Sequence, residues 1–175
     1  MEEIVKLSIA MTPHKLPSFY RIKNKKNLKQ YIMEKKQILY FEDEKWFAND
    51  VFIKIENNTQ CIVTSINTPA QFFREIKSDM KYDLFILDIM TPMMIFTDDD
   101  IKNQLTNNQV RKLNGGLDVG IVFYEIIREK EKYKETPVIF YTAKPKPQIL
   151  DNNFVYFSKP AEEIKIINTI NLLLK

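Results

Sequence analysis

The sequence predicts an α/β fold, a doubly wound sheet of five parallel strands with helices on both faces. Five short apolar runs recur along the chain from residue 37 onward, and they do not alternate with polar residues. Such runs are typical of parallel strands that are covered on both faces. The segments between them carry apolar residues at helical spacing, and this alternation with short connections indicates right-handed βαβ units.

The predicted elements follow one another in a regular order. The five strands are 38–41, 61–63, 84–87, 138–141 and 154–157, all rich in β-branched and aromatic residues. The helices are predicted from four apolar sets: Phe47, Val51, Phe52 and Ile55; Phe72, Phe73 and Ile76; Leu117, Ile121, Val122 and Ile126; and Ile166, Ile167, Ile170, Leu173 and Leu174. The second helix is expected to begin at Thr68-Pro69, because threonine is a good cap and proline suits the first helical position.

Charge is distributed unevenly along the 175 residues. The net charge is +3, but residues 1–36 alone carry +6 and the remaining residues carry −3. We therefore expect a basic N-terminal extension, 1–36, and one folded domain, 37–175. No run approaches the ~20 apolar residues of a membrane span, and a single cysteine cannot form an internal disulfide. Both observations favour a cytoplasmic protein.

Polar side chains follow four of the predicted strands. Glu42 and Asp43 follow the first strand, Asp88 the third, Thr142 the fourth and Lys159 the fifth. An acid in this position is by itself usually a helix cap, so the prediction depends on all these positions together. The carboxyl ends of parallel strands meet at one edge of a sheet, and crowded carboxylates repel one another unless a cation lies among them.

Oxygen ligands without histidine or cysteine suit a hard ion such as Mg²⁺. A carboxylate beside Mg²⁺ and a fixed lysine can accept a phosphoryl group, because both cations neutralise charge on the transferred group. The residues thus indicate a metal and phosphoryl site at the carboxyl edge of the sheet.

The ordered set of motifs resembles the receiver domain of response regulators in two-component signalling. The matching stretches are 38–44, 82–92, Gly116-Leu117, 137–143 and Ser158-Lys159-Pro160. The resemblance covers about residues 37–175. It implies the flavodoxin-like (CheY-like) receiver fold, with Asp88 as the phosphoacceptor.

The resemblance also implies a metal site. Glu42 and Asp43 match the acidic pair that holds Mg²⁺ with Asp88, and Met90 is expected to contribute its backbone carbonyl. Glu42 stands where aspartate is usual, and its extra methylene group allows it to bind the metal through water.

Three further residues match the switch of the family. Thr142 corresponds to the switch hydroxyl, Lys159 to the lysine that contacts the phosphoryl group, and Tyr156 to the aromatic residue that changes rotamer on activation. The Lys159–Pro160 bond is expected in cis, as in relatives.

The loop from Asp88 to Gly116 departs from the family, because it is roughly 20 residues longer than in relatives. The insertion spans about 93–115. Its apolar segment Met93–Phe96 is either local packing or a lid for partner docking. Its acidic run Thr97–Asp100 either starts a short helix or forms a second metal site, and the first reading is favoured.

The segment between Thr142 and Tyr156 is the second departure. It has 13 residues, and Pro145 and Pro147 stand where relatives begin their fourth helix. Proline removes a backbone donor and disfavours helical geometry before it, so this helix is expected to be shortened. The usual output face of the family is then altered.

The sequence is compatible with two main functions. The first is a stand-alone response-regulator receiver that accepts a phosphoryl group on Asp88 from a histidine kinase or phosphotransfer protein and signals to a protein partner. The alternative is a pseudo-receiver that binds proteins without phosphorylation. An aspartyl phosphohydrolase is disfavoured, because Met90 stands where such enzymes carry a second aspartate. The chemistry is therefore limited to self-phosphorylation and autodephosphorylation, and the extension shows no nucleic-acid-binding motif, so nucleic acid is not an expected partner.

Overall fold

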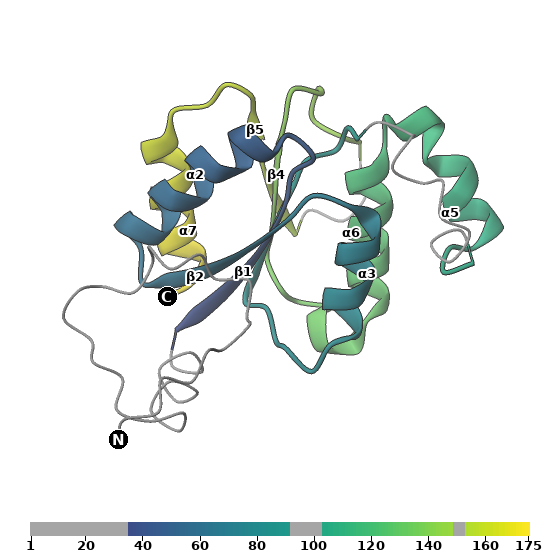
Figure 1. Ribbon diagram of the computed structural model, residues 1–175, viewed down its shortest axis with the longest axis horizontal. Helices are drawn as coiled ribbons and strands as arrows, with labels where there is room; N and C mark the ends of the chain where they lie inside the picture. The colour runs from purple at the N-terminus through teal and green to yellow at the C-terminus, as the bar shows by residue number, and fades with distance from the viewer. Residues whose placement is uncertain (1–34, 92–102, 149–152) are drawn as a thin grey trace, which may run out of the picture. The chain divides into compact units, whose positions relative to one another are not determined.

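The computed structural model describes residues 35–91, 103–148 and 153–175 (Figure 1). Most of the predicted extension, the segments Met93–Phe96 and Thr97–Asp100, and residues 149–152 lie outside the described residues. The described residues belong to one compact unit that begins at Lys35.

Five parallel strands form one sheet in the order β2-β1-β3-β4-β5, which confirms the predicted fold class. The strands are β1 (Lys36–Phe41), β2 (Cys61–Ile66), β3 (Leu84–Leu87), β4 (Val138–Thr142) and β5 (Phe154–Ser158). The chain leaves β1 to form β2 on one side and then crosses back to form β3 on the other. The strand order therefore reverses between β1 and β3, and in open α/β sheets this position is where ligands bind.

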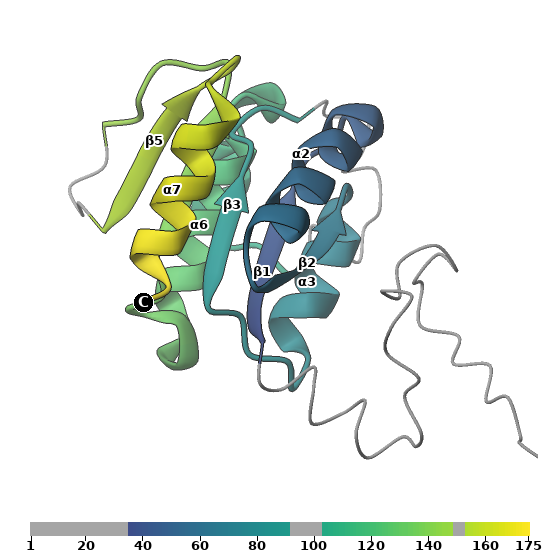
Figure 2. The same cartoon turned by 90° about the vertical axis from the view of Figure 1, so that its left-hand side faces the viewer.

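Helices cover both faces of the sheet, as Figures 1 and 2 show. The helical elements are α2 (Lys45–Asn58), α3 (Pro69–Lys77), α5 (Asn107–Lys112), the 3₁₀ turn η2 (Asn114–Gly116), α6 (Val119–Glu129), the 3₁₀ turn η3 (Glu131–Tyr133) and α7 (Glu163–Leu173). Helices α2 and α7 pack on one face, and α3 and α6 pack on the other. Among the described helices, none is both long and apolar enough to cross a membrane.

The two faces are filled with different side chains. On the α3/α6 face, the rings of Phe72 and Phe123 are stacked with centroids 3.8 Å apart, and Phe41 meets Phe123 edge-on at 4.9 Å. The α2/α7 face is mainly aliphatic, and Ile55 of α2 and Ile166 of α7 are almost fully buried there. Burial of this kind stabilises the fold by about 25 cal/mol per Å² of apolar surface.

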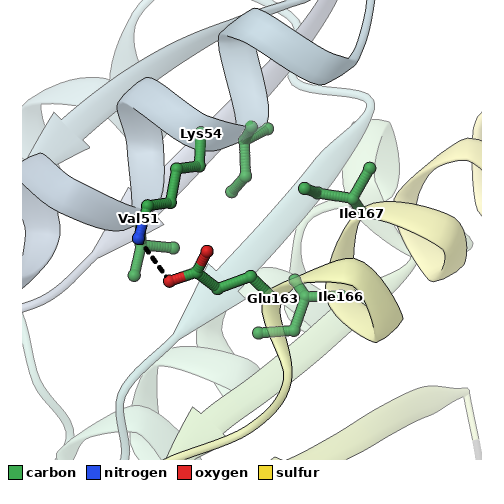
Figure 3. Close-up of a pocket in the computed structure, with 6 residues that line it drawn as sticks. Val51, Lys54, Glu163, Ile166 and Ile167 are labelled. Carbon is green, nitrogen blue, oxygen red and sulfur yellow. Dashed lines mark hydrogen bonds and ion pairs between the residues drawn. The ribbon is translucent and has the colours of Figure 1, made fainter.

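Figure 3 shows where α2 meets α7 at the surface. Lys54 of α2 donates a hydrogen bond to Glu163 of α7 at 2.5 Å and another to Asp50 at 2.7 Å, above Val51 and Ile166. These three charged side chains are substantially exposed, so the ion pairs contribute little to stability. The apolar contacts beneath them hold the helices together.

The predicted start of α3 is confirmed. The side chain of Thr68 accepts a hydrogen bond from the backbone N–H of Gln71 at 3.3 Å, and the side chain of Gln71 accepts one from the backbone N–H of Thr68 at 3.1 Å. This reciprocal pair is a capping box, and Pro69 occupies the first turn.

The predicted third helix begins later than expected. Leu117 was placed on its buried face, but α6 starts at Val119 and Leu117 is 43% exposed. Gly115 and Gly116 have positive φ values of 68° and 90°, which interrupt a helix just before this point. The prediction for Leu117 was therefore wrong, whereas Val122 and Ile126 are buried as expected.

The end of the insertion contains a helix that the sequence reasoning missed, although a signal for it is present. Thr106 and Gln109 form a capping box at the start of α5. The side chain of Gln109 is buried and donates to Glu129 at 3.3 Å, and Lys112 pairs with Glu125 at 2.6 Å. Both acceptors lie on α6, so this part of the insertion docks against that helix.

The connection between β4 and β5 has no helix in the part of it that the structure describes, residues 143–148 and 153. Pro145 and Pro147 lie in this stretch, as the sequence reasoning noted. Residues 149–152 lie outside the described residues, so the length of a fourth helix stays a prediction.

Candidate functional site

Three carboxylates gather where β1 and β3 end. The register places Phe41 beside Leu87, so the residues that follow these strands are neighbours. Asp88 donates its backbone N–H to the carbonyl of Phe41 at 3.0 Å, which fixes the end of β3 against β1. Carboxylate oxygens of Glu42, Asp43 and Asp88 lie within 4.8 Å of one another.

Lys159 is the cation of the site in this structure. It follows β5, and its Nζ lies 2.6 Å from Oδ2 of Asp88 and 2.5 Å from Oε2 of Glu42. The backbone N–H of Lys159 donates to the carbonyl of Thr142 at 2.8 Å, and the following peptide bond to Pro160 is cis, as expected. The ammonium group also lies 4.8 Å from the ring centroid of Phe47, a cation–π contact.

Burial and repulsion between neighbouring carboxylates raise the pKa values of two of these acids. Burial and the neighbouring Asp88 raise the pKa of Glu42 to about 7, although Lys159 opposes this change. The same two causes raise the pKa of Asp43. Burial lowers the pKa of Lys159, but Asp88 and Glu42 outweigh it and hold that pKa above the usual range.

The charges of the site fit a divalent ion. Three ionised carboxylates and one ammonium group leave a net charge of −2. The acidic side chains that lie together offer oxygen donors alone, which is the ligand type that Mg²⁺ prefers. The groups expected to hold it are the carboxylates of Glu42, Asp43 and Asp88 and the backbone carbonyl of Met90; Asp43, Asp88 and Met90 line the cleft.

A cleft of about 390 Å³ opens onto these groups. Its lining residues are Asp43, Glu44, Asp88, Met90, Thr91, Gly115, Gly116, Leu117, Ala143 and Lys159. The backbone N–H of Met90 donates to Oδ1 of Asp88 at 3.2 Å, and the role of its carbonyl as a metal ligand stays a prediction. Asp88 is 7% exposed and lies at the floor of the cleft.

Gly120 brings α6 close to Asp88. A Cβ at this position would lie 2.2 Å from the carbonyl oxygen of Asp88, and the backbone N–H of Gly120 donates to Ile89 at 3.1 Å. The carbonyl of Gly116 accepts from Thr91 at 2.9 Å. The sequence prediction gave Gly120 no role, because a glycine inside a helical pattern does not by itself show what packs against it.

Thr142 and Tyr156 each form a hydrogen bond with the backbone of Lys144, which lies between them in the sequence. The hydroxyl of Thr142, which is fully buried, accepts from the backbone N–H of Lys144 at 3.2 Å. The hydroxyl of Tyr156 donates to the backbone carbonyl of Lys144 at 2.6 Å. The ammonium group of Lys144 pairs with Asp118, which precedes α6. Sequence reasoning missed Lys144 and Asp118, because neither stands directly after a strand.

Solved structures similar to this chain are mostly receiver domains. The receiver domain of Francisella response regulator 1452 shares 22% identity with a TM-score of 0.55, covering 79% of this chain and 96% of that one. Chemotaxis protein CheY4 of Vibrio cholerae shares 16% identity with a TM-score of 0.57, covering 80% of this chain and 99% of that one.

A third similar structure is the signal receiver domain of a signal transduction histidine kinase from Syntrophus aciditrophicus. It shares 18% identity with a TM-score of 0.56, covering 79% of this chain and 89% of that one. No family model and no curated protein sequence matches the chain. The chain therefore has the fold of a response-regulator receiver domain, established by structure.

Proposed function

We propose that this protein is a response-regulator receiver, phosphorylated on Asp88 by a histidine kinase or a phosphotransfer protein. One observation carries the proposal: Nζ of Lys159 lies 2.6 Å from Oδ2 of Asp88, beside Asp43, at the floor of an open cleft. A nucleophile, a fixed cation and a second carboxylate for a metal ion are the groups that phosphoryl transfer to aspartate needs.

The reaction requires little movement of the chain. A carboxylate oxygen of Asp88 attacks the phosphorus atom, and the new P–O bond forms as the bond to the donor nitrogen breaks. Lys159 neutralises charge on the transferred group from its present position. Asp43, Asp88 and the carbonyl of Met90, with Glu42 next to them, would hold Mg²⁺, which would supply further charge neutralisation.

The connection through Lys144 gives a route from the site to the surface. When Asp88 carries a phosphoryl group, the hydroxyl of Thr142 is drawn to a phosphoryl oxygen and leaves the N–H of Lys144. The carbonyl of Lys144 accepts the hydrogen bond from the hydroxyl of Tyr156. When the backbone at Lys144 moves, this hydrogen bond breaks and the tyrosine side chain can change its position. A protein partner then binds the altered surface around β4 and β5.

The proposal places the chain in the cytoplasm, where the buried Cys61 thiol stays reduced. Self-phosphorylation and autodephosphorylation at Asp88 are its only chemistry, and the downstream partner is a protein.

Phosphorylation is tested with acetyl phosphate, a small phosphodonor, and Mg²⁺. Intact-mass analysis of the wild type should show the addition of one phosphoryl group, and chelation of Mg²⁺ should prevent it. Asp88→Asn removes the nucleophile and should remain unmodified. Asp79→Asn, an exposed aspartate outside the site, is the matched control and should behave as the wild type. Wild-type protein that stays unmodified at saturating donor would instead support a pseudo-receiver that binds partners without phosphorylation.

A further inference from the structure

We propose that the ion pair between Lys144 and Asp118 is a latch that holds the segment after β4, residues 143–148, in its resting conformation and opens when Asp88 is phosphorylated. We call residues 143–148 the switch segment. The proposal rests on the proposed function, because it names a contact that opposes the response of that site. Neither Lys144 nor Asp118 is among the residues that line the cleft.

The ion pair joins two parts of the chain that both border the cleft. Ala143, which precedes Lys144, lines the cleft just after β4. Leu117, which precedes Asp118, lines it just before α6. The ammonium group of Lys144 donates a hydrogen bond to the carboxylate of Asp118. The pair therefore ties the switch segment to the start of α6.

The carboxylate of Asp118 does not have the usual task of an aspartate at the start of a helix. Such a side chain ordinarily accepts a hydrogen bond from a backbone N–H of the first turn. Asp118 is the N-cap residue of α6, but its side chain accepts no such bond from the described first turn. Its backbone carbonyl accepts from Ile121 and Val122, both at 3.1 Å. The helix thus fixes the backbone of Asp118, while the carboxylate faces Lys144.

Lys144 is the residue through which the switch segment is held. Its backbone N–H donates to the hydroxyl of Thr142, and its carbonyl accepts from the hydroxyl of Tyr156. Its ammonium group adds the contact with Asp118. A backbone shift that breaks the first two contacts also changes the position from which the lysine side chain reaches Asp118. The switch and the ion pair are therefore linked.

The local structure of the switch segment makes this side-chain contact important. The segment contains no helix within its described residues, 143–148, so no ladder of helical hydrogen bonds holds it there. Pro145 and Pro147 lack a backbone N–H and restrict the residues before them. Side chains hold the segment instead: Lys144 contacts Asp118, and Nζ of Lys146 lies 5.7 Å from the ring centroid of Phe154.

Partial burial favours a stronger ion pair here than at the open surface. The side chains of Lys144 and Asp118 are 25% and 23% exposed, whereas those of Lys54 and Glu163 in Figure 3 are 38% and 45% exposed. Water and salt screen the less exposed pair less. An ion pair of this strength can bias a conformational equilibrium about fivefold, and it can still open when a phosphoryl group draws Thr142 away.

The test measures how tightly the full chain binds beryllofluoride, a mimic of the phosphoryl group, at saturating Mg²⁺. Asp118→Asn and Lys144→Met both break the pair, but they change the charge near the bound anion in opposite directions. Asp118→Asn should bind beryllofluoride about fivefold more tightly than the wild type. Lys144→Met should also bind it more tightly, by about twofold, because the loss of a positive charge offsets part of the gain.

Two further variants check that the pair itself is responsible. Glu125→Gln is the matched control, because it breaks an ion pair of the same helix, with Lys112 at 2.6 Å, away from the switch segment. Its beryllofluoride affinity should stay within about twofold of the wild type. The double variant of Asp118→Asn and Lys144→Met should bind no more tightly than Asp118→Asn alone, because one contact is lost only once.

Three results would overturn the proposal. Lys144→Met could bind beryllofluoride more weakly than the wild type, and the effect of Asp118→Asn would then be charge alone. The gains of the two single variants could multiply in the double variant, and the residues would then act separately. Asp118→Asn could also leave the backbone amide NMR signals of Thr142 and Tyr156 unmoved in the ligand-free protein, and the pair would then not hold the switch segment.

Failure of the proposed function gives a different result. Wild-type protein that binds no beryllofluoride contradicts phosphorylation at Asp88. The amide signals of Thr142 and Tyr156 in ligand-free Asp118→Asn still decide whether the ion pair holds the switch segment, because that measurement needs no phosphoryl group.

Discussion

The carboxyl ends of β1 and β3 differ from those of β4 and β5 in what holds their side chains in place. At β1 and β3, three acids lie together above a packed aromatic core, and α6 approaches so closely that only glycine fits at position 120. At β4 and β5, Thr142 and Tyr156 are connected through the backbone of one loop residue, Lys144. The first region, the acid half, is crowded and charged. The second, the switch half, is connected through neutral hydrogen bonds to the backbone of Lys144.

The acid half and the switch half differ in what their side chains cost to bury. Crowded carboxylates in the acid half oppose folding, so their arrangement has to be enforced by close packing around them. The switch half contains neutral hydrogen bonds worth about 1 kcal/mol each, which can be exchanged for others without unfolding. On the proposed function, binding chemistry belongs to the acid half and conformational change to the switch half.

The largest effect is expected where packing enforces the acid half. Gly120→Ala would place a Cβ 2.2 Å from the carbonyl oxygen of Asp88 and 2.8 Å from Cα of Ile89, and these backbone atoms cannot move aside. We expect the free energy of unfolding to fall by about 3 kcal/mol. Denaturant unfolding measures it. Gly115→Ala is the control, since Gly115 meets no atom within 4 Å and its φ of +68° alone should cost about 1 kcal/mol. Equal losses in the two variants would contradict the close approach.

The free energy of unfolding of the metal-free protein should depend on pH, because the buried carboxylate of Glu42 destabilises the folded state when it is ionised. Folding raises the pKa of Glu42 from 4.5 to about 7, mainly because of burial, so the folded state holds a proton that the unfolded state has lost. Stability therefore falls as pH rises through this window and is level on either side. Relative to Glu42→Gln, the wild type should lose about 3 kcal/mol between these pH values. Parallel curves for the two proteins would show that Glu42 does not titrate in this range.

Mg²⁺ should relieve the repulsion within the acid half. At 100 times the dissociation constant, a ligand of the folded state stabilises it by about 2.7 kcal/mol. The effect should be larger at about pH 8 than at about pH 5, because the raised pKa values of Glu42 and Asp43 let protons compete with the metal. Thermal unfolding at matched ionic strength measures the shift. Asp88→Asn should lose most of it, and an undiminished shift in that variant would place the ion elsewhere.

The smallest effect is expected in the switch half. Tyr156→Phe removes the hydrogen bond to the carbonyl of Lys144 and should lower the free energy of unfolding by about 1 kcal/mol. Tyr133→Phe is a matched control, because its hydroxyl also donates to a backbone carbonyl, that of Met80, at 2.8 Å. Both variants should lose similar stability, but only Tyr156→Phe should shift the backbone amide NMR signals of Thr142 and Lys144. Unmoved signals would show that the tyrosine is not coupled to the threonine.

The sequence alone predicted the five strands, four of the helices and the acidic set, because all of these depend on local patterns. Uninterrupted apolar runs identify strands buried on both faces, and Thr68-Pro69 identifies the start of α3 from two adjacent residues. The positions of Glu42, Asp43 and Asp88 directly after two strands were sufficient to expect them at one edge. Parallel strands allow this inference because all their carboxyl ends point the same way.

Only the tertiary structure decided which residues of the site contact one another. Lys159 and Glu42 are 117 positions apart in the chain; the strand pattern placed both at one edge of the sheet but did not predict their ion pair. The docking of α5 on α6 through Gln109, and the exposure of Leu117 after two glycines of positive φ, likewise depend on contacts between distant segments. Local spacing determines which face of an element is apolar. The partner of a buried charge is determined by which chain segments the fold brings within hydrogen-bond distance.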